Sequence, residues 1–188
     1  MADPTSVIGL VLRAVTMIGD LITRRRRAEA APKIVITTPL KPNQASESWR
    51  EWLHLSVENV QRAGASETRS VDARIFGQLD DEAERPLFWS VGYRGELRTT
   101  LDAGVPVSVP IAIRDSRAAT PVYNNTLEPG VAYLTDWQFV QRAPRKLPPK
   151  RYRLRVRVQY DQATERTAEF YLTVGRDSGL PLELSRRI

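Results

Sequence analysis

Few residues in this chain have the chemistry of a catalytic site. Cysteine is absent and His54 is the only histidine, which excludes thiolate metal sites and most nucleophile–base arrangements. His54 takes an outward position on an expected strand, two outward positions before Glu58, so the two are either a proton-transfer pair or ordinary surface residues, the simpler interpretation. Neither a glycine-rich phosphate loop nor a G-x-S-x-G motif occurs. We therefore predict that the chain is not an enzyme and binds no cofactor or metal.

The acidic run LDDEAE at 79–84 is the nearest approach to a cation site. It lacks the alternating Asp/Asn positions, the central glycine and the closing glutamate of an EF-hand loop. We expect a solvated loop.

Four arginines alternate with apolar residues in RYRLRVRVQY, and together they are called the arginine row: Arg151, Arg153, Arg155 and Arg157. On a strand they would share one face and span about 20 Å, which suits the backbone of a nucleic acid. The next strand turns Glu169 and Tyr171 to the same side, where ion pairing and stacking would neutralise part of the row. Three interpretations are open: a solvated or salt-bridged face, a protein-docking face and a nucleic-acid face.

The opening stretch SVIGLVLRAVTMIGDLITRRRR, from Ser6 to Arg27, has the pattern of an apolar helix with a narrow polar stripe. The 20 residues from Pro4 to Thr23 would form about 30 Å of helix, enough to cross a bilayer. Its nine Val, Ile and Leu residues favour insertion, whereas Arg13 and Asp20 oppose insertion by a comparable amount. The helix therefore spans a membrane, lies in its plane or packs on protein in an assembly.

Four consecutive arginines follow this helix and favour lipid, because such residues attract anionic headgroups: Arg24, Arg25, Arg26 and Arg27. If the helix spans, the positive-inside rule places the C-terminal part of the chain in the cytoplasm. The net charge of +6 permits both anionic lipid and nucleic acid as partners.

From Lys33 onward the pattern changes to the period-two alternation of strands. We predict strands at 33–37, 53–60, 71–79, 86–93, 105–113, 132–140, 151–160 and 167–174. In the segment 105–113, Val105, Val107, Val109, Ile111 and Ile113 are expected to share one face. Its prolines, Pro106 and Pro110, predict an edge strand, because their missing N–H groups lie on one side.

Seven or eight short strands with turn signals between them predict a mainly β chain: a single antiparallel immunoglobulin-like β-sandwich preceded by one N-terminal amphipathic or transmembrane-like helix. The predicted divisions are an apolar helix with a basic collar at 1–27, a linker at 28–32, the β-sandwich domain at 33–175 and a C-terminal tail at 176–188. The tail has no strong periodicity, so two alternatives stand: it is loose, or it is docked on the domain.

Two stretches resemble immunoglobulin-like bacterial modules of the CARDB type. LHLSVENVQRAGASETRSVDARI is similar to their paired strands, an L-x-V-x-N strand followed by a short loop and a V-x-A-x-I strand. LPPKRYRLRVRV is similar to their L-x-P-G-x-Y-x-L-x-V stretch, with Lys150 in place of the glycine. The resemblance covers roughly residues 33–174. It implies the sandwich fold, a tyrosine corner at Tyr152 and a binding or scaffolding role.

We therefore expect a non-catalytic, membrane-attached interaction or scaffolding protein that presents its β-sandwich on the cytoplasmic side. Its expected partners are a membrane with anionic lipid headgroups, another protein, and further copies of the chain through the N-terminal helix. The residues expected to serve membrane attachment and assembly are Arg13, Asp20, Arg24, Arg25, Arg26 and Arg27, and those for partner binding are the arginine row. One alternative is a structural subunit of a larger assembly with the helix buried between subunits. The second is a nucleic-acid-binding module that uses the arginine-lined strand.

Overall fold

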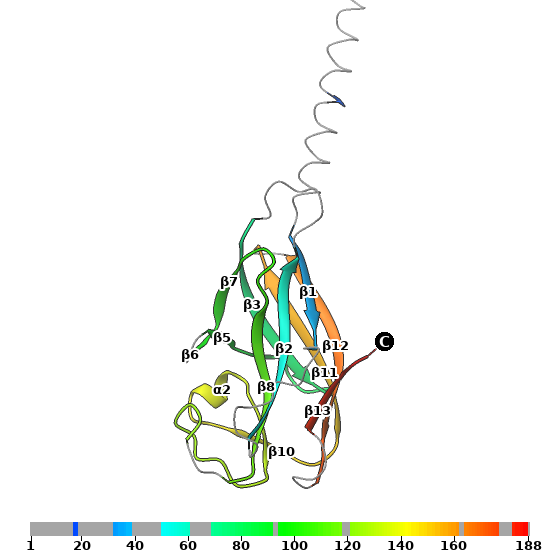
Figure 1. Cartoon of the computed structure of the whole chain (residues 1–188). Coiled ribbons are helices and arrows are strands. Elements are labelled where there is room, and N and C mark those ends of the chain that lie inside the picture. The colour runs from blue at the N-terminus through cyan, green and yellow to red at the C-terminus, as the bar shows by residue number, and fades with distance from the viewer. Residues whose placement is uncertain are drawn as a thin grey trace, which may run out of the picture.

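The computed structural model describes residues 17–18, 32–38, 50–60, 69–91, 94–117, 121–161, 164–176 and 182–187, and this part of the chain is mainly β (Figure 1). The predicted N-terminal helix and its basic collar, with Arg13, Asp20 and Arg24–Arg27, lie outside these residues apart from Met17 and Ile18. Within the described residues, no helix combines the length and the apolar character needed to cross a bilayer.

The first sheet of the described chain has five strands in the order β1-β2-β8-β9-β10, and each neighbouring pair is antiparallel. Its strands are β1 (Lys33–Thr37), β2 (Arg50–Val60), β8 (Val107–Asp115), β9 (Ala132–Leu134) and β10 (Arg145–Leu147).

The second sheet runs in the order β13-β12-β11-β3-β4, again antiparallel throughout, and β7 pairs with β3 beside β4. Its strands are β13 (Leu182–Arg186), β12 (Thr164–Val174), β11 (Arg151–Tyr160), β3 (Val71–Leu79), β4 (Arg85–Pro86) and β7 (Arg98–Leu101). A two-stranded ribbon, β5 (Trp89–Val91) with β6 (Arg94–Glu96), and the short helix α2 (Trp137–Val140) complete the described elements.

Both sheets contribute to one apolar core, because each strand turns alternate residues inward. The first sheet supplies Ile34, Leu55 and Val109, and the second supplies Ile75 and Phe170, all of them buried. The strands predicted at 53–60, 71–79, 151–160 and 167–174 are confirmed, and alternate residues along each of them are turned toward the core.

The prediction of an edge strand at 105–113 is wrong. β8 lies inside the first sheet, with β2 on one side and β9 on the other. The sheet tolerates the prolines because Pro106 precedes β8, while Pro110 pairs with His54 at a register shift, beyond the three residues that pair with β9.

The same register shift explains a second error in the prediction for this strand. Val109, Ile111 and Ala112 all contact the main core, whereas Ile113 packs in a smaller cluster on the opposite face of the sheet. The bulge advances the pleat by one residue, so Ile113 does not share the face of Val109.

Two predicted strands are broken, and several short strands were not predicted, so the described chain has thirteen strands rather than seven or eight. The segment 86–93 divides into β4 and β5 around the buried Phe88. The segment 132–140 stops as a strand at Leu134 and continues as α2, where Asp136 Oδ1 accepts a hydrogen bond of 3.1 Å from the Phe139 N–H as the helix N-cap. Within the tail, Leu182–Arg186 is the ordered strand β13, paired with β12.

Candidate binding groove and the arginine row

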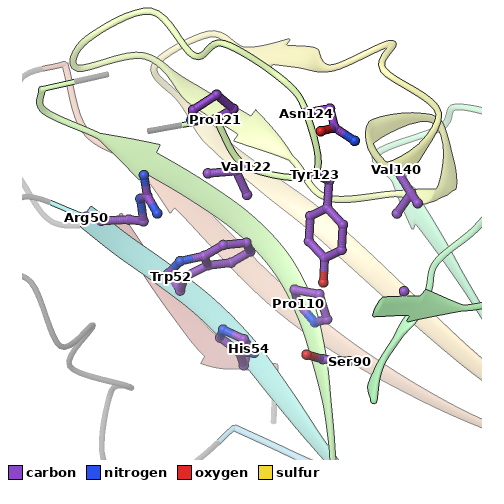
Figure 2. A pocket seen from close by; sticks show the side chains of 11 residues that line it. Arg50, Trp52, His54, Ser90, Pro110, Pro121, Val122, Tyr123, Asn124 and Val140 are labelled. Atoms are coloured by element: carbon purple, nitrogen blue, oxygen red, sulfur yellow. The ribbon is translucent and has the colours of Figure 1, made fainter. Parts of the chain in front are cut away.

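A groove of about 740 Å³ lies on the outer face of the first sheet, away from the main core. Its floor is Trp52 and His54 of β2 with Pro110 of β8, and Tyr123 and Ser90 stand across from them (Figure 2). This surface, which Arg50, Gly95, Pro121, Val122, Asn124 and Val140 complete, is called the Trp52 groove. Its volume lies within the range of sites that bind small molecules.

A tight turn at Val122–Asn125 presents Tyr123 to the groove. Val122 N–H donates to the Asn125 carbonyl at 3.0 Å, and Asn125 N–H donates to the Val122 carbonyl at 2.8 Å. The two central residues have positive φ, 48° at Tyr123 and 63° at Asn124, as in a type I′ turn. Asparagine adopts this conformation readily, but a tyrosine there is uncommon and must be held by its surroundings.

The contacts that hold the turn are specific. The Asn125 side-chain amide donates to the Phe139 carbonyl at 2.7 Å, which ties the turn to α2. The Tyr123 ring packs edge-on against Phe88 and Phe139, with centroids 5.3 and 6.3 Å apart. Tyr123 is therefore fixed by packing, and its ring is directed over the groove (Figure 2).

The wall of the groove has its own small core, formed by Ile113, Val122, Leu127, Tyr133 and Phe139. Trp52 and Tyr123 pack against this cluster from the groove side. Gly95 is required here for space, because a Cβ at this position would lie 2.7 Å from Phe88 Cδ2 and 3.0 Å from Val140 Cγ2. The groove is thus built on packed elements, which keep its shape without a ligand.

No net charge is exposed by the groove's described side chains. Arg50 is neutralised by Asp115, which is fully buried, through Nη2–Oδ2 and Nε–Oδ2 distances of 2.8 and 3.1 Å. Burial lowers the pKa of His54 from 6.5 to about 4, so its ring is neutral at physiological pH. Burial raises the pKa of Tyr123, against a smaller opposing effect of a hydrogen bond with Ser90, so its phenol is also neutral.

His54 contacts Ser108 rather than Glu58. Its Nδ1 lies 2.7 Å from Ser108 Oγ, and its ring lies against Trp52 with centroids 5.6 Å apart. A serine and a histidine are two members of a hydrolytic triad, but the described contacts of His54 include no carboxylate that would orient it. No group of three His, Asp or Glu residues in the described chain is placed to hold a metal ion.

The arginine row lies on the outer face of the second sheet, as predicted, and its members have partners there. Arg155 pairs with Glu169 at 3.2 Å, and Arg151 stacks over the Tyr171 ring at 3.9 Å, both as predicted. Arg153 pairs with Asp81 at 2.9 Å, and Arg157 pairs with both Glu84 and Glu165, at 2.5 and 3.2 Å. Three arginines of the row are thus ion-paired, and the fourth, Arg151, is stacked on an aromatic ring.

The acidic run at 79–84 supplies carboxylate partners to the arginine row and to other cationic side chains nearby. Asp80 accepts from Lys150 at 2.8 Å and from the Arg153 backbone N–H at 2.8 Å, and Glu82 pairs with Arg145. The hydrogen bond from Lys150 is the main reason that the pKa of Asp80 is lowered, and the one from Arg145 does the same for Glu82. The run thus binds cationic side chains of β10 and β11.

The aromatic residues of the groove were missed by the sequence reasoning, although two signals mark them. Trp52 is an outward position on the same strand face as His54, and an outward tryptophan indicates a covered face. The VYNN stretch at 122–125 contains two asparagines, the residue type that favours left-handed turns after glycine.

No protein-family model, no curated protein and no solved structure matches the chain.

Proposed function

We propose that this chain is a non-catalytic interaction module that recruits another protein through the Trp52 groove. The observation that carries the proposal is the Tyr123 turn, in which a strained aromatic residue is fixed opposite Trp52 and His54. Such strain persists when surrounding packing imposes it, and it concentrates at ligand clamps. Rigid aromatic side chains with a few polar atoms are also the usual anchors of protein interfaces.

We further propose that the two sheets form an immunoglobulin-like β-sandwich of the CARDB type. Two antiparallel sheets with a common core support it. A second support is Tyr152, whose hydroxyl donates to the Pro148 carbonyl at 2.8 Å, the backward hydrogen bond of a tyrosine corner.

The module is held at a membrane by its N-terminal segment, with the β part on the cytoplasmic side. The support is the apolar stretch at 7–22 followed by Arg24–Arg27, which together provide insertion energy and attraction to anionic headgroups. Copies of the chain associate through this segment, because Arg13 and Asp20 are best accommodated against partner helices.

The nucleic-acid alternative is weakened by the ion pairs of the arginine row. Arginines of the row already form four ion pairs, with the carboxylates of Asp81, Glu84, Glu165 and Glu169. A phosphate backbone would have to displace these partners, so the affinity that four free arginines would supply is not available in full.

Photo-crosslinking in the native host tests the recruiting surface. The full chain carries p-benzoylphenylalanine in place of Pro121, an exposed residue of the groove rim, or in place of Arg155 on the other sheet as the matched control. We expect a discrete protein adduct from the Pro121 position, and its loss when Trp52→Ala is added. Adducts from Arg155 alone would move the function to the arginine row, and no adduct at either position would contradict the proposal.

Fractionation tests the membrane part. The full chain should remain with membranes through a carbonate wash and be released by detergent, whereas a variant without residues 1–32 should be soluble. If the full chain is instead soluble as a defined large particle, the structural-subunit alternative replaces membrane attachment.

A further inference from the structure

We propose that the ligand of the Trp52 groove is an uncharged, proline-containing peptide segment in the extended polyproline II conformation. This inference rests on the proposed function and names the chemistry that the groove recognises. Polyproline segments are commonly bound by aromatic-lined grooves, because they are already extended and lose little conformational entropy on binding.

The groove has no uncompensated charge among its described residues, and this favours an uncharged ligand. Arg50 is compensated by Asp115 across 2.8 Å, His54 is neutral, and the remaining described lining residues are apolar or carry hydroxyl and amide groups. A charged ligand would leave water for a site with no opposite charge to replace its hydration. Phosphorylated and acidic segments are thereby disfavoured.

The side-chain donors of the groove favour a ligand that presents hydrogen-bond acceptors. Pro110 and Pro121 lack backbone N–H groups, so the donors that the groove offers at these positions come from neighbouring side chains. The groove does contain side-chain donors, the Trp52 indole N–H and the Asn124 amide, which make no hydrogen bond within the described part of the chain. A polyproline segment has only carbonyl acceptors along its backbone, which is the complement of this set.

The angles between the aromatic rings also favour a ligand with a protruding ring edge over a flat sugar ring that stacks face to face. The Trp52 and His54 rings are inclined by 45° to one another, so they do not form one plane on which a pyranose could stack. Tyr123 stands over them from the opposite side (Figure 2). The resulting channel has aromatic walls on two sides, into which a proline ring can insert.

The channel is preorganised, which raises affinity for a stiff ligand. The ring of His54 is positioned by Ser108 at 2.7 Å, and Tyr123 is held by Phe88 and Phe139. When both partners are stiff, little motion is lost on association, so even a short segment can bind measurably.

The test is a titration of the full chain in mild detergent, with ¹⁵N-labelled tryptophan side chains observed by NMR. The chain has four tryptophans, so the Trp52 indole signal is assigned from the Trp52→Phe variant. The probe is acetylated decaproline amide. We expect a saturable shift of the Trp52 signal with a Kd of about 1 mM or tighter, while an uncharged alanine–serine peptide of equal length binds at least about tenfold more weakly.

Two variants separate the groove from the rest of the surface. Trp52→Ala should reduce the affinity for decaproline at least about tenfold, and His54→Ala should reduce it by a smaller factor, because only part of the floor is lost. The matched control is Tyr171→Ala, which removes an aromatic ring from the outer face of the second sheet and should leave the affinity unchanged.

Three results would overturn the inference: no shift with decaproline at about 10 mM, equal affinity for the alanine–serine peptide, or a stronger response to maltoheptaose or cellohexaose. These failures are distinguishable from failure of the proposed function. A protein adduct at the Pro121 position together with any of them would leave the recruiting role intact and reject the polyproline ligand alone. Absence of both would reject the groove as a binding surface.

Discussion

The Nδ1 atom of His54 on β2 lies 2.7 Å from the Oγ of Ser108 on β8, beside the bulge that divides β8 between two apolar clusters. This hydrogen bond satisfies one ring nitrogen of a histidine that is otherwise half-buried against Trp52. The imidazole is therefore a neutral part of the packing on the outer face of the first sheet, and its protonation is unfavourable in the folded state.

Stability should fall on acidification because of His54. Its pKa is about 4 in the folded chain and 6.5 ordinarily, so between these values the unfolded chain binds a proton that the folded chain does not. This stabilising contribution is present in full above pH 6.5 and is lost as the pH falls to about 4, with a total of up to about 3 kcal/mol. Urea unfolding of the full chain at pH 7 and pH 4.5 measures the change.

His54→Gln is the control for this pH dependence, because the carboxylates of the ion pairs also titrate in acid. The variant keeps those carboxylates, so the difference between the two chains isolates the histidine. If both chains lose the same stability between pH 7 and pH 4.5, His54 is not the group responsible.

Asp115→Ala should destabilise the chain by about 3 kcal/mol, because it leaves the partly buried Arg50 guanidinium without its carboxylate. It also removes the acceptor for the Arg117 N–H, at 2.9 Å. Chemical unfolding measures the loss. Glu128→Ala is the matched control, since its ion pair with Lys146 is exposed at 58% and 57%, and its removal should cost much less stability. Equal effects of the two substitutions would contradict the importance of burial.

Gly95→Ala should cost about 1 to 3 kcal/mol and disturb the groove, because the new methyl group must displace Phe88, against which Tyr123 packs. Near-ultraviolet circular dichroism reports the changed surroundings of these rings, and thermal unfolding reports the stability. Gly104→Ala is the control: its φ of +72° makes alanine unfavourable by about 1 kcal/mol, but its Cβ would meet nothing within 4 Å. A Gly95→Ala chain with an unchanged aromatic spectrum would show that the wall tolerates the methyl group.

Removing three of the four acidic partners of the arginine row, while Glu165 stays beside Arg157, should create affinity for nucleic acid. We expect the variant Asp81→Asn, Glu84→Gln, Glu169→Gln to bind single-stranded DNA at least about tenfold more tightly than the natural chain at low salt, with the gain lost at high salt. Fluorescence anisotropy with a labelled oligonucleotide measures both. If the natural chain already binds tightly with a steep salt dependence, the arginine row is a nucleic-acid site in spite of its ion pairs.

The sequence predicts the strands whose two faces differ in polarity. In β11 the alternation of arginine with apolar residues fixes which face is inward, and even the pairing of Arg155 with Glu169 follows from it. This alternation does not predict the faces of β8, because both faces of that strand are buried. The residues of β8 therefore do not alternate in polarity, and nothing in their pattern marks the bulge. Alternation also fails at 132–140, where Asp136 caps a short helix among apolar residues that otherwise resemble a strand.

The candidate groove was beyond the sequence reasoning for a different reason. Trp52 comes from a strand and Tyr123 from a distant turn, and only the pairing of β2 with β8 and the docking of α2 place them on one surface. The residues proposed for membrane attachment, Arg13, Asp20 and Arg24–Arg27, lie outside the described residues.

The order of the strands in the sheets has a consequence for synthesis of the chain. β3 lies in the second sheet beside β11, and their contact at Asp80 and Arg153 joins residues 73 positions apart. At about 5 to 20 residues per second, a ribosome makes β3 roughly 4 to 15 s before its central partner exists. During that interval β3, whose apolar face contains Val71, Ala73 and Ile75, has an edge that β11 does not yet cover, and such an unpaired edge favours aggregation of the nascent chain.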